Sequence, residues 1–176
     1  MYTKGSTHDY FIEQYKQLHE GGYTQGYRIS PTYGTRDTLK VLLEKYNCKS
    51  LFDFGCASAI HWIETDLQEY LGIEELYLYD PAIEKYNTYP AEQFDASFCI
   101  DVMEHIPEDS IDYIVNRVLD RTKKLAIFRI AICEASTLLP DGQNAHVTVQ
   151  NSQWWRERIA QHKRDGIAIE VNKVVV

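Results

Sequence analysis

A three-layer α/β sandwich with a mostly parallel sheet is the fold class that the sequence predicts. Short apolar segments of strand length alternate along the chain with longer segments whose apolar residues recur at helical spacing. Parallel strands need a crossover connection, which a helix usually supplies, so this alternation favours a parallel sheet covered by helices. The 176 residues, 44% of them hydrophobic, suffice for one domain with a packed core.

The first 34 residues predict a helix followed by a loop. The helix covers residues 8 to 20, and the loop over residues 21 to 34 is rich in glycine and tyrosine. Several side chains of this loop are expected either to form a lid over the site or to pack over the open edge of the sheet. They are Tyr23, Tyr27, Arg28 and Tyr33. The α/β core is expected to follow over residues 35 to 176, within a single domain that spans the chain.

The first half of the core predicts two helices and two strands. A helix over residues 36 to 46 precedes a strand over residues 50 to 54, which is short, apolar and followed by a glycine. A helical stripe then runs from Ile60 to Tyr70. The second strand covers residues 75 to 79.

The crossover after the second strand is expected to be shortened. Only thirteen residues separate Asp80 from Phe94, and they include Pro81 and Pro90. A full helix and a further strand do not fit in this length. We therefore expect a turn or a short irregular segment, which leaves one edge of the sheet cut back.

The second half of the core continues the alternation. Strands are expected over residues 96 to 100 and 125 to 130, with a helix over residues 108 to 120 between them. A helix over residues 151 to 163 follows, and residues 167 to 176 close the sheet. The complete sheet is expected to have six or seven strands.

Composition and charge narrow the classes of partner. The net charge of -8 argues against nucleic acid, because binding to a phosphate backbone draws on clusters of lysine and arginine. The densest basic cluster is expected to be the solvated face of the last helix. Its members are Arg156, Arg158, Lys163 and Arg164. No apolar run approaches the roughly 20 residues that span a bilayer, so we expect no membrane partner and a cytoplasmic location.

Three acidic residues lie at or just after the ends of predicted strands. In an open α/β sheet, ligands bind beyond the carboxyl ends of the strands, near the point where the strand order reverses. Asp53, Asp80 and Asp101 are therefore candidates for a ligand site. The small residues Gly55 and Ala57 follow the first strand, where they let the backbone approach a ligand closely.

Three motifs resemble those of class I S-adenosylmethionine-dependent methyltransferases, which have a Rossmann-like fold. Residues 51 to 59, LFDFGCASA, contain an acidic residue followed by a turn of small residues. Asp80 and Pro81 end the second strand, and residues 94 to 107 resemble the family signature fDlvv..dvlEHip. The resemblance covers about residues 36 to 130. It implies methyl transfer from S-adenosylmethionine to a hydroxyl or amine of a small molecule.

The resemblance also assigns residues to the cofactor site. These are Asp53, Gly55, Cys56, Ala57, Asp80, Pro81 and Asp101. Asp53 would orient the ammonium group of the cofactor, and the backbone from Gly55 to Ala57 would line its methionine part. Asp80 would accept hydrogen bonds from the ribose hydroxyls, because an ionised carboxylate offers only acceptors.

Two alanines depart from the family pattern. Ala57 and Ala59 stand where the family usually has its second and third glycines. At a negative φ the added methyl group is harmless, but at a positive φ it would strain the loop by about 1 kcal/mol or more. This departure and the shortened crossover favour one alternative, a catalytically inactive module for cofactor binding or for interaction.

The catalytic candidates are Glu104, His105 and His146. Asp101, Glu104 and His105 have a spacing at which side chains converge on a helical turn, so they could hold a divalent cation. Some methyltransferases that act on RNA 3′-terminal or catechol hydroxyls hold a metal on a similar cluster, and His146 would then add a ligand.

A metal at this segment would lower the pKa of a substrate hydroxyl, which gives a second alternative function, methylation of a hydroxyl of RNA or another nucleic acid. The favoured interpretation has no metal, and Glu104 and His105 orient the loop. In a third interpretation, His105 or His146 is a general base.

Overall fold

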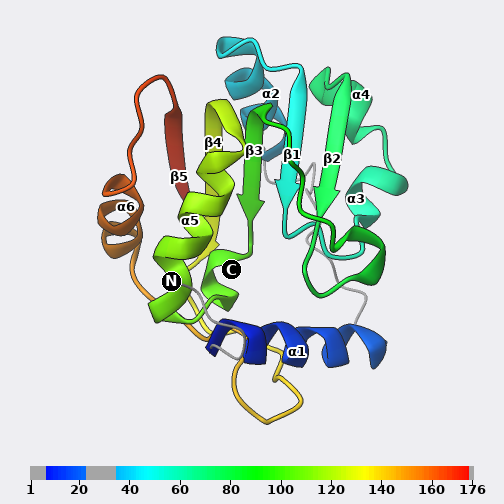
Figure 1. The fold of residues 1–176 in the computed structure, drawn as a ribbon, viewed down its shortest axis with the longest axis vertical. Helices are drawn as coiled ribbons and strands as arrows, with labels where there is room; N and C mark the ends of the chain where they lie inside the picture. Colours follow the sequence, from blue (N-terminus) through cyan, green and yellow to red (C-terminus); the bar gives the residue numbers. More distant parts are fainter. Residues whose placement is uncertain (1–6, 23–34, 175–176) are drawn as a thin grey trace.

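A sheet of parallel strands forms the middle layer of the protein (Figure 1). The computed structural model describes residues 7 to 22 and 35 to 174. In this part the sheet has five strands in the order β2-β1-β3-β4-β5, and every neighbouring pair is parallel. The strands are β1 Ser50–Phe54, β2 Glu75–Tyr79, β3 Phe94–Ile100, β4 Thr122–Ala131 and β5 Ala168–Val174. The predicted α/β class is confirmed, whereas the expectation of six or seven strands is wrong for the described residues.

Helices cover both faces of this sheet, which gives the three layers that the alternation predicted. On one face, α5 and α6 pack against the sheet, and on the other face α2, α3 and α4 do so. These helices are α2 Thr35–Lys45, α3 Ile60–Ile63, α4 Leu67–Leu71, α5 Ile111–Asp120 and α6 Ser152–Ala160. The first helix, α1 Thr7–Glu20, lies outside the three layers, across the end of the sheet to which the strands point (Figure 1).

Strand β1 shows why the central strands are apolar almost throughout. Leu51 packs in the core beneath α2 and α4, whereas Phe52 and Phe54 pack on the face of α5. Successive side chains of a strand point to opposite faces, so a strand covered on both sides needs apolar residues at nearly every position. The exception is Asp53, which lies on the face of Leu51 and is buried.

The continuous helix predicted from Ile60 to Tyr70 is wrong, because the structure has two short helices, α3 and α4, joined by a bend. The hydroxyl of Thr65 donates to the carbonyl of His61 at 2.5 Å and accepts from the N–H of Leu67 at 3.2 Å. A threonine side chain that bonds to nearby backbone competes with the helical hydrogen bonds. Thr65 therefore closes α3 and opens α4. The other predicted elements lie within three residues of the observed bounds.

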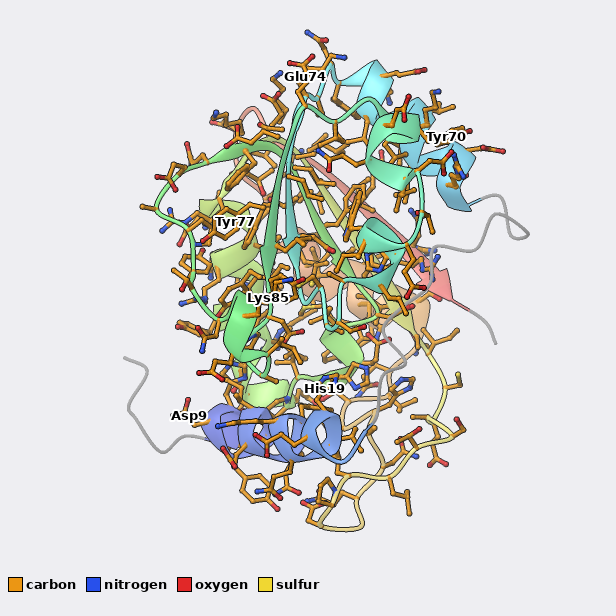
Figure 2. The ribbon with its side chains drawn as sticks, turned by 90° about the vertical axis from the view of Figure 1, so that its right-hand side faces the viewer. Asp9, His19, Tyr70, Glu74, Tyr77 and Lys85 are labelled. Carbon is orange, nitrogen blue, oxygen red and sulfur yellow. The ribbon has the colours of Figure 1, made fainter. Side chains whose placement is uncertain are left out.

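The shortened crossover after β2 is confirmed. Residues 80 to 93 contain one 3₁₀ turn, Glu84–Tyr86, and no α-helix. The segment folds back along the sheet instead, because the Tyr77 hydroxyl of β2 donates to the carbonyl of Thr88 at 3.1 Å (Tyr77 is labelled in Figure 2). Tyr89 packs into the core on the face of α5. In the described sheet, β2 is therefore an edge strand.

The basic cluster predicted to be a solvated face is partly used in ion pairs. The guanidinium of Arg158 on α6 donates to both carboxylate oxygens of Asp112 on α5, at 2.7 and 2.8 Å. Arg164 pairs with Asp120 at 2.7 Å. The expectation is therefore wrong for these two arginines, which are half-buried and join α6 and the segment after it to α5.

Other sequence expectations concern membranes, cysteines and the tyrosine loop. Within residues 7 to 22 and 35 to 174, no helix is long and apolar enough to cross a membrane. The four cysteines are free thiols, and all of them except Cys133 are buried. The proposed lid residues lie outside the described residues. They are Tyr23, Tyr27, Arg28 and Tyr33.

Candidate functional site

A cavity of about 680 Å³ lies between α1 and the carboxyl ends of the strands. Its walls come from α1, the turn after β1, the end of β2, and the segments that follow β3 and β4. Chain order reverses between β1 and β3, because β2 is added on one side of β1 and β3 on the other. Ligands of open α/β sheets bind at such a point, and the volume is within the usual range of ligand pockets.

Helix α1 covers the cavity from the side opposite the sheet. Figure 2, in which Asp9 and His19 are labelled near its two ends, shows the helix lying across below the strands. Tyr15 fixes its position, because the hydroxyl lies 2.7 Å from the carbonyl oxygen of Ala145 and 3.2 Å from that of His105. Burial raises the pKa of Tyr15 well above its usual value, so the hydroxyl stays a donor. No local pattern predicts this contact, because it joins residues far apart in the chain.

The turn after β1 is anchored to the end of β2. The N–H groups of Gly55 and Cys56 both donate to the carbonyl of Tyr79, at 2.7 and 3.1 Å. Gly55 has a φ of +85°, and a Cβ placed on it would lie 2.3 Å from Cγ2 of Val102. Gly55 and Ala57 line the cavity, whereas the Cys56 side chain is buried beneath the turn. Glycine is thus required by the backbone and by the space available.

Ala57 and Ala59, which replace glycines of the family pattern, both have positive φ values of 47° and 54°. The condition under which the sequence predicted strain is therefore met. Each alanine is held in the left-handed region, which costs an L-residue roughly 1–2 kcal/mol. The turn keeps this conformation because its N–H groups are bonded to the end of β2 and to Asp80.

Replacing Ala57 with glycine is expected to stabilise the protein by about 0.5–1 kcal/mol. The relief of backbone strain exceeds the extra entropy that glycine gives the unfolded chain. Ala59→Gly is the matched comparison, because Ala59 has a similar φ but is fully buried, so that loss of its methyl group also leaves a void. Chemical denaturation measures both, and an Ala57→Gly protein less stable than the wild type would contradict the assignment of strain.

Asp80 ends β2 and is the acidic group best placed at the turn. Its Oδ2 accepts from the N–H of Ala57 at 2.9 Å, and its Oδ1 accepts from the N–H of Ala82 at 2.8 Å. Burial raises the pKa of Asp80, while these two hydrogen bonds act in the opposite direction. Asp80 and Pro81 line the cavity. A carboxylate has about four acceptor positions, so Asp80 has acceptors left for a ligand.

Asp53, the residue assigned to the ammonium group of the cofactor, does not line the cavity. Its Oδ2 accepts from the indole N–H of Trp62 at 2.7 Å and lies 3.4 Å from Nε2 of His61. Asp53 therefore supports the turn from below, within the core on the face of α2. Neither Trp62 nor His61 was among the candidates, because their pairing with Asp53 depends on how α3 packs against β1.

Asp101 is the first residue after β3 and lines the cavity. Its φ is +53°, and its Oδ2 accepts from Arg129 Nη2 at 3.1 Å. Burial raises the pKa of Asp101, and Arg129 partly opposes that shift. The other oxygen, Oδ1, is buried and has no hydrogen-bond partner among the described residues.

Glu104, His105 and His146 form a compact group in the same cavity. One carboxylate oxygen and one nitrogen from each ring lie within 4.8 Å of one another. The two imidazole rings are edge to face, with centroids 4.9 Å apart. Glu104 and His105 lie on a 3₁₀ turn after β3, and His146 comes from the loop after β4, so the fold brings together the three catalytic candidates.

Burial sets the protonation states of this group. It raises the pKa of Glu104 to about 8, with the nearby Asp101 acting in the same direction, and it lowers the pKa of His105 to about 4. At neutral pH the metal-free group is therefore expected to contain a protonated carboxyl group beside a neutral imidazole. Such a pair can donate and accept a proton, which is the capacity that general acid–base chemistry needs.

Arg117 and Tyr113 on α5 line the cavity close to the end of β2, and sequence reasoning missed both. Arg117 Nη1 donates to the Tyr113 hydroxyl at 3.1 Å, and Nη2 donates to the Tyr79 hydroxyl at 3.3 Å. The guanidinium also lies over the Tyr89 ring, 3.6 Å from its centroid. Both lie beside the buried apolar stripe of α5, four residues apart, and nothing in the local sequence marks them as part of a site.

Comparisons of the chain with models of protein families, with curated proteins and with solved structures give no match.

Proposed function

We propose that the cavity binds S-adenosylmethionine and that the protein transfers its methyl group to a hydroxyl or amine of a small molecule. One observation carries the proposal. The N–H of Ala57 donates to the Asp80 carboxylate, so the small-residue turn after β1 and the acidic end of β2 form one continuous wall of the cavity. This wall lies at the reversal of strand order, where a nucleoside ligand of an open α/β sheet is expected.

The residues of the wall fit the parts of that cofactor. Gly55 and Ala57 offer close approach to backbone, and the free acceptor positions of Asp80 suit a pair of ribose hydroxyls. Bound there, S-adenosylmethionine would supply an electrophilic methyl group on its sulfonium sulfur. The protein contributes mainly orientation, because the transfer is an in-line displacement.

The acceptor would enter beside His146. The Nδ1 of His146 lies 2.6 Å from the carbonyl oxygen of Cys133. Because a carbonyl oxygen only accepts hydrogen bonds, Nδ1 carries the proton of the neutral ring and Nε2 has a lone pair. In the absence of a metal, that lone pair would accept the proton of the acceptor hydroxyl or amine as the acceptor bonds to the methyl carbon and the bond from that carbon to the sulfonium sulfur breaks. The small-molecule class is favoured over nucleic acid because two arginines of the basic cluster, Arg158 and Arg164, are paired with carboxylates.

A catalytically inactive binding module is the second candidate, and the positive φ values of Ala57 and Ala59 favour it. This strain weakens ligand binding only if the turn must change its conformation when the ligand binds. Binding of S-adenosylmethionine without turnover across a broad set of acceptors would support this candidate against methyl transfer.

Calorimetric titration with S-adenosylmethionine and S-adenosylhomocysteine tests the cofactor site directly. Binding in the range of about 1–100 μM is expected, and Asp80→Asn is expected to weaken it at least tenfold. Asp66→Asn is the matched control, because Asp66 is exposed and pairs with Arg36 away from the cavity. No binding of either ligand, or equal binding by the two variants, would overturn the proposal.

A further inference from the structure

Both histidines of the cavity are held in one orientation by the backbone. Nδ1 of His105 lies 2.7 Å from the carbonyl oxygen of Ala145, and Nδ1 of His146 lies 2.6 Å from that of Cys133. Because a carbonyl accepts only, each Nδ1 carries the proton and each Nε2 presents a lone pair. A ring N–H bonded to a backbone carbonyl is the usual outer contact of a histidine that binds a metal, since it fixes the tautomer and the orientation of the ring.

The carboxyl group of Glu104 has one oxygen in use and one without a partner. Oε1 accepts from the N–H of Ala131 at 3.0 Å. Oε2 is buried, and no described residue offers it a hydrogen bond. Solvent does not satisfy it either, because the side chain is fully inaccessible to solvent. Leaving a buried polar atom unsatisfied costs about 1–3 kcal/mol. A positively charged ligand at this oxygen would remove that cost.

These groups converge on one point of the cavity wall. One oxygen of Glu104 and one nitrogen each of His105 and His146 lie within 4.8 Å of one another, and all three side chains line the cavity. Asp101, a ligand candidate on sequence grounds, is not part of this set and pairs with Arg129 instead. Of the four candidate ligands from the sequence, the structure thus groups two imidazoles and one carboxylate.

We propose that Glu104, His105 and His146 bind one divalent transition-metal ion, which keeps open positions toward the cavity. Two imidazoles with one carboxylate suit zinc, manganese, iron(II) or cobalt, whereas magnesium and calcium prefer sites made of oxygen ligands. Three protein ligands are the number found where a metal also binds water or a substrate. The site forms without S-adenosylmethionine, so it stands or falls separately from the proposed cofactor site. A bound metal would occupy the Nε2 lone pair of His146 and would itself lower the pKa of an acceptor hydroxyl.

Titration of the chelator-treated, metal-free protein with Co²⁺ and Zn²⁺, without S-adenosylmethionine, tests the site. One ion per chain is expected, with an affinity at least tenfold higher than for Mg²⁺. Visible absorption of the Co²⁺ complex is expected to have the intensity of a four- or five-coordinate ion. Glu104→Gln and His146→Asn are each expected to weaken binding at least tenfold.

His162→Asn is the matched control, because His162 is bonded to Asp112 on the surface of α6 and α5, away from the cavity. Circular dichroism shows whether each variant is folded. The Co²⁺ spectrum of the unmodified protein tests the site even if a variant does not fold. A six-coordinate spectrum typical of the ion in water, or equal Zn²⁺ affinity in the His146→Asn and His162→Asn proteins, would overturn the proposal. Titration of the cofactor in the presence of a chelator then reports separately on the methyl-donor site.

Discussion

Gly55→Ala is expected to destabilise the protein by about 2–5 kcal/mol and to abolish binding of S-adenosylmethionine. Two independent costs add at this position. The φ of +85° places an L-residue in the left-handed region, at roughly 1–2 kcal/mol, and the new Cβ would lie 2.3 Å from Cγ2 of Val102. Forcing an extra carbon into a packed site typically costs another 1–3 kcal/mol. Chemical denaturation and calorimetric titration measure the two effects.

Two comparisons separate the backbone cost from the steric cost. Gly142→Ala is the matched control for the backbone, because Gly142 has a φ of +87° and, its chain neighbours apart, no atom of the described residues lies within 4 Å of its Cβ position. It is expected to lose only about 1–2 kcal/mol. Adding Val102→Ala to Gly55→Ala should remove the steric part alone. If the Gly55 and Gly142 variants are equally stable, the close contact with Val102 contributes nothing to the loss of unfolding free energy.

In metal-free protein, Glu104 is expected to lower the free energy of unfolding by about 3 kcal/mol as the pH rises from 5 to 8. Glu104→Gln is expected to abolish this part of the pH dependence. The pKa of Glu104 is raised from 4.5 in the unfolded chain to about 8 in the folded protein. The stability that the protonated group provides is therefore fully present below pH 4.5. It decreases as the pH rises, and its loss is complete once the pH has passed about 8.

Glu108→Gln is the control for this prediction, because it removes an exposed carboxyl group from the same segment. His105 contributes in the opposite sense, since its pKa is lowered from 6.5 to about 4 and its contribution is lost as the pH falls through that interval. Both variants retain that contribution. Denaturation curves at several pH values, with a chelator present, give the comparison. A Glu104→Gln protein with the pH profile of the wild type would contradict a buried, protonated carboxyl group.

The sequence predicted the order of elements because the apolar spacing of strands and helices is a local property. It also placed most of the site, because the carboxyl ends of parallel strands meet at one edge of a sheet. Asp80 and Glu104 are examples, and both line the cavity. Asp53 does not, because alternation along β1 directs its side chain into the core, where Trp62 binds it.

Other parts of the site depend on packing between distant segments. Tyr15 reaches the cavity because α1 crosses the end of the sheet, and nothing in its local sequence specifies that docking. Asp101, a candidate metal ligand, pairs with Arg129 instead of joining the group of Glu104, His105 and His146, and this contact between neighbouring strand ends is not visible in the local sequence. The five-stranded sheet also differs from the expected six or seven strands, because the shortened crossover after β2 leaves out a unit that the fold class would otherwise contain.

The cut-back edge at β2 has a consequence for contacts between molecules. An unpaired strand edge is a template on which a second chain can add a strand, and such edges promote aggregation when they are long, flat and apolar. Here the edge strand has only five residues, Glu75–Tyr79, and Glu74 and Glu75 stand exposed at its start. Tyr77 is bonded to the returning segment at Thr88. The shortened crossover therefore leaves β2 at the edge of the described sheet without creating an edge that invites strand exchange.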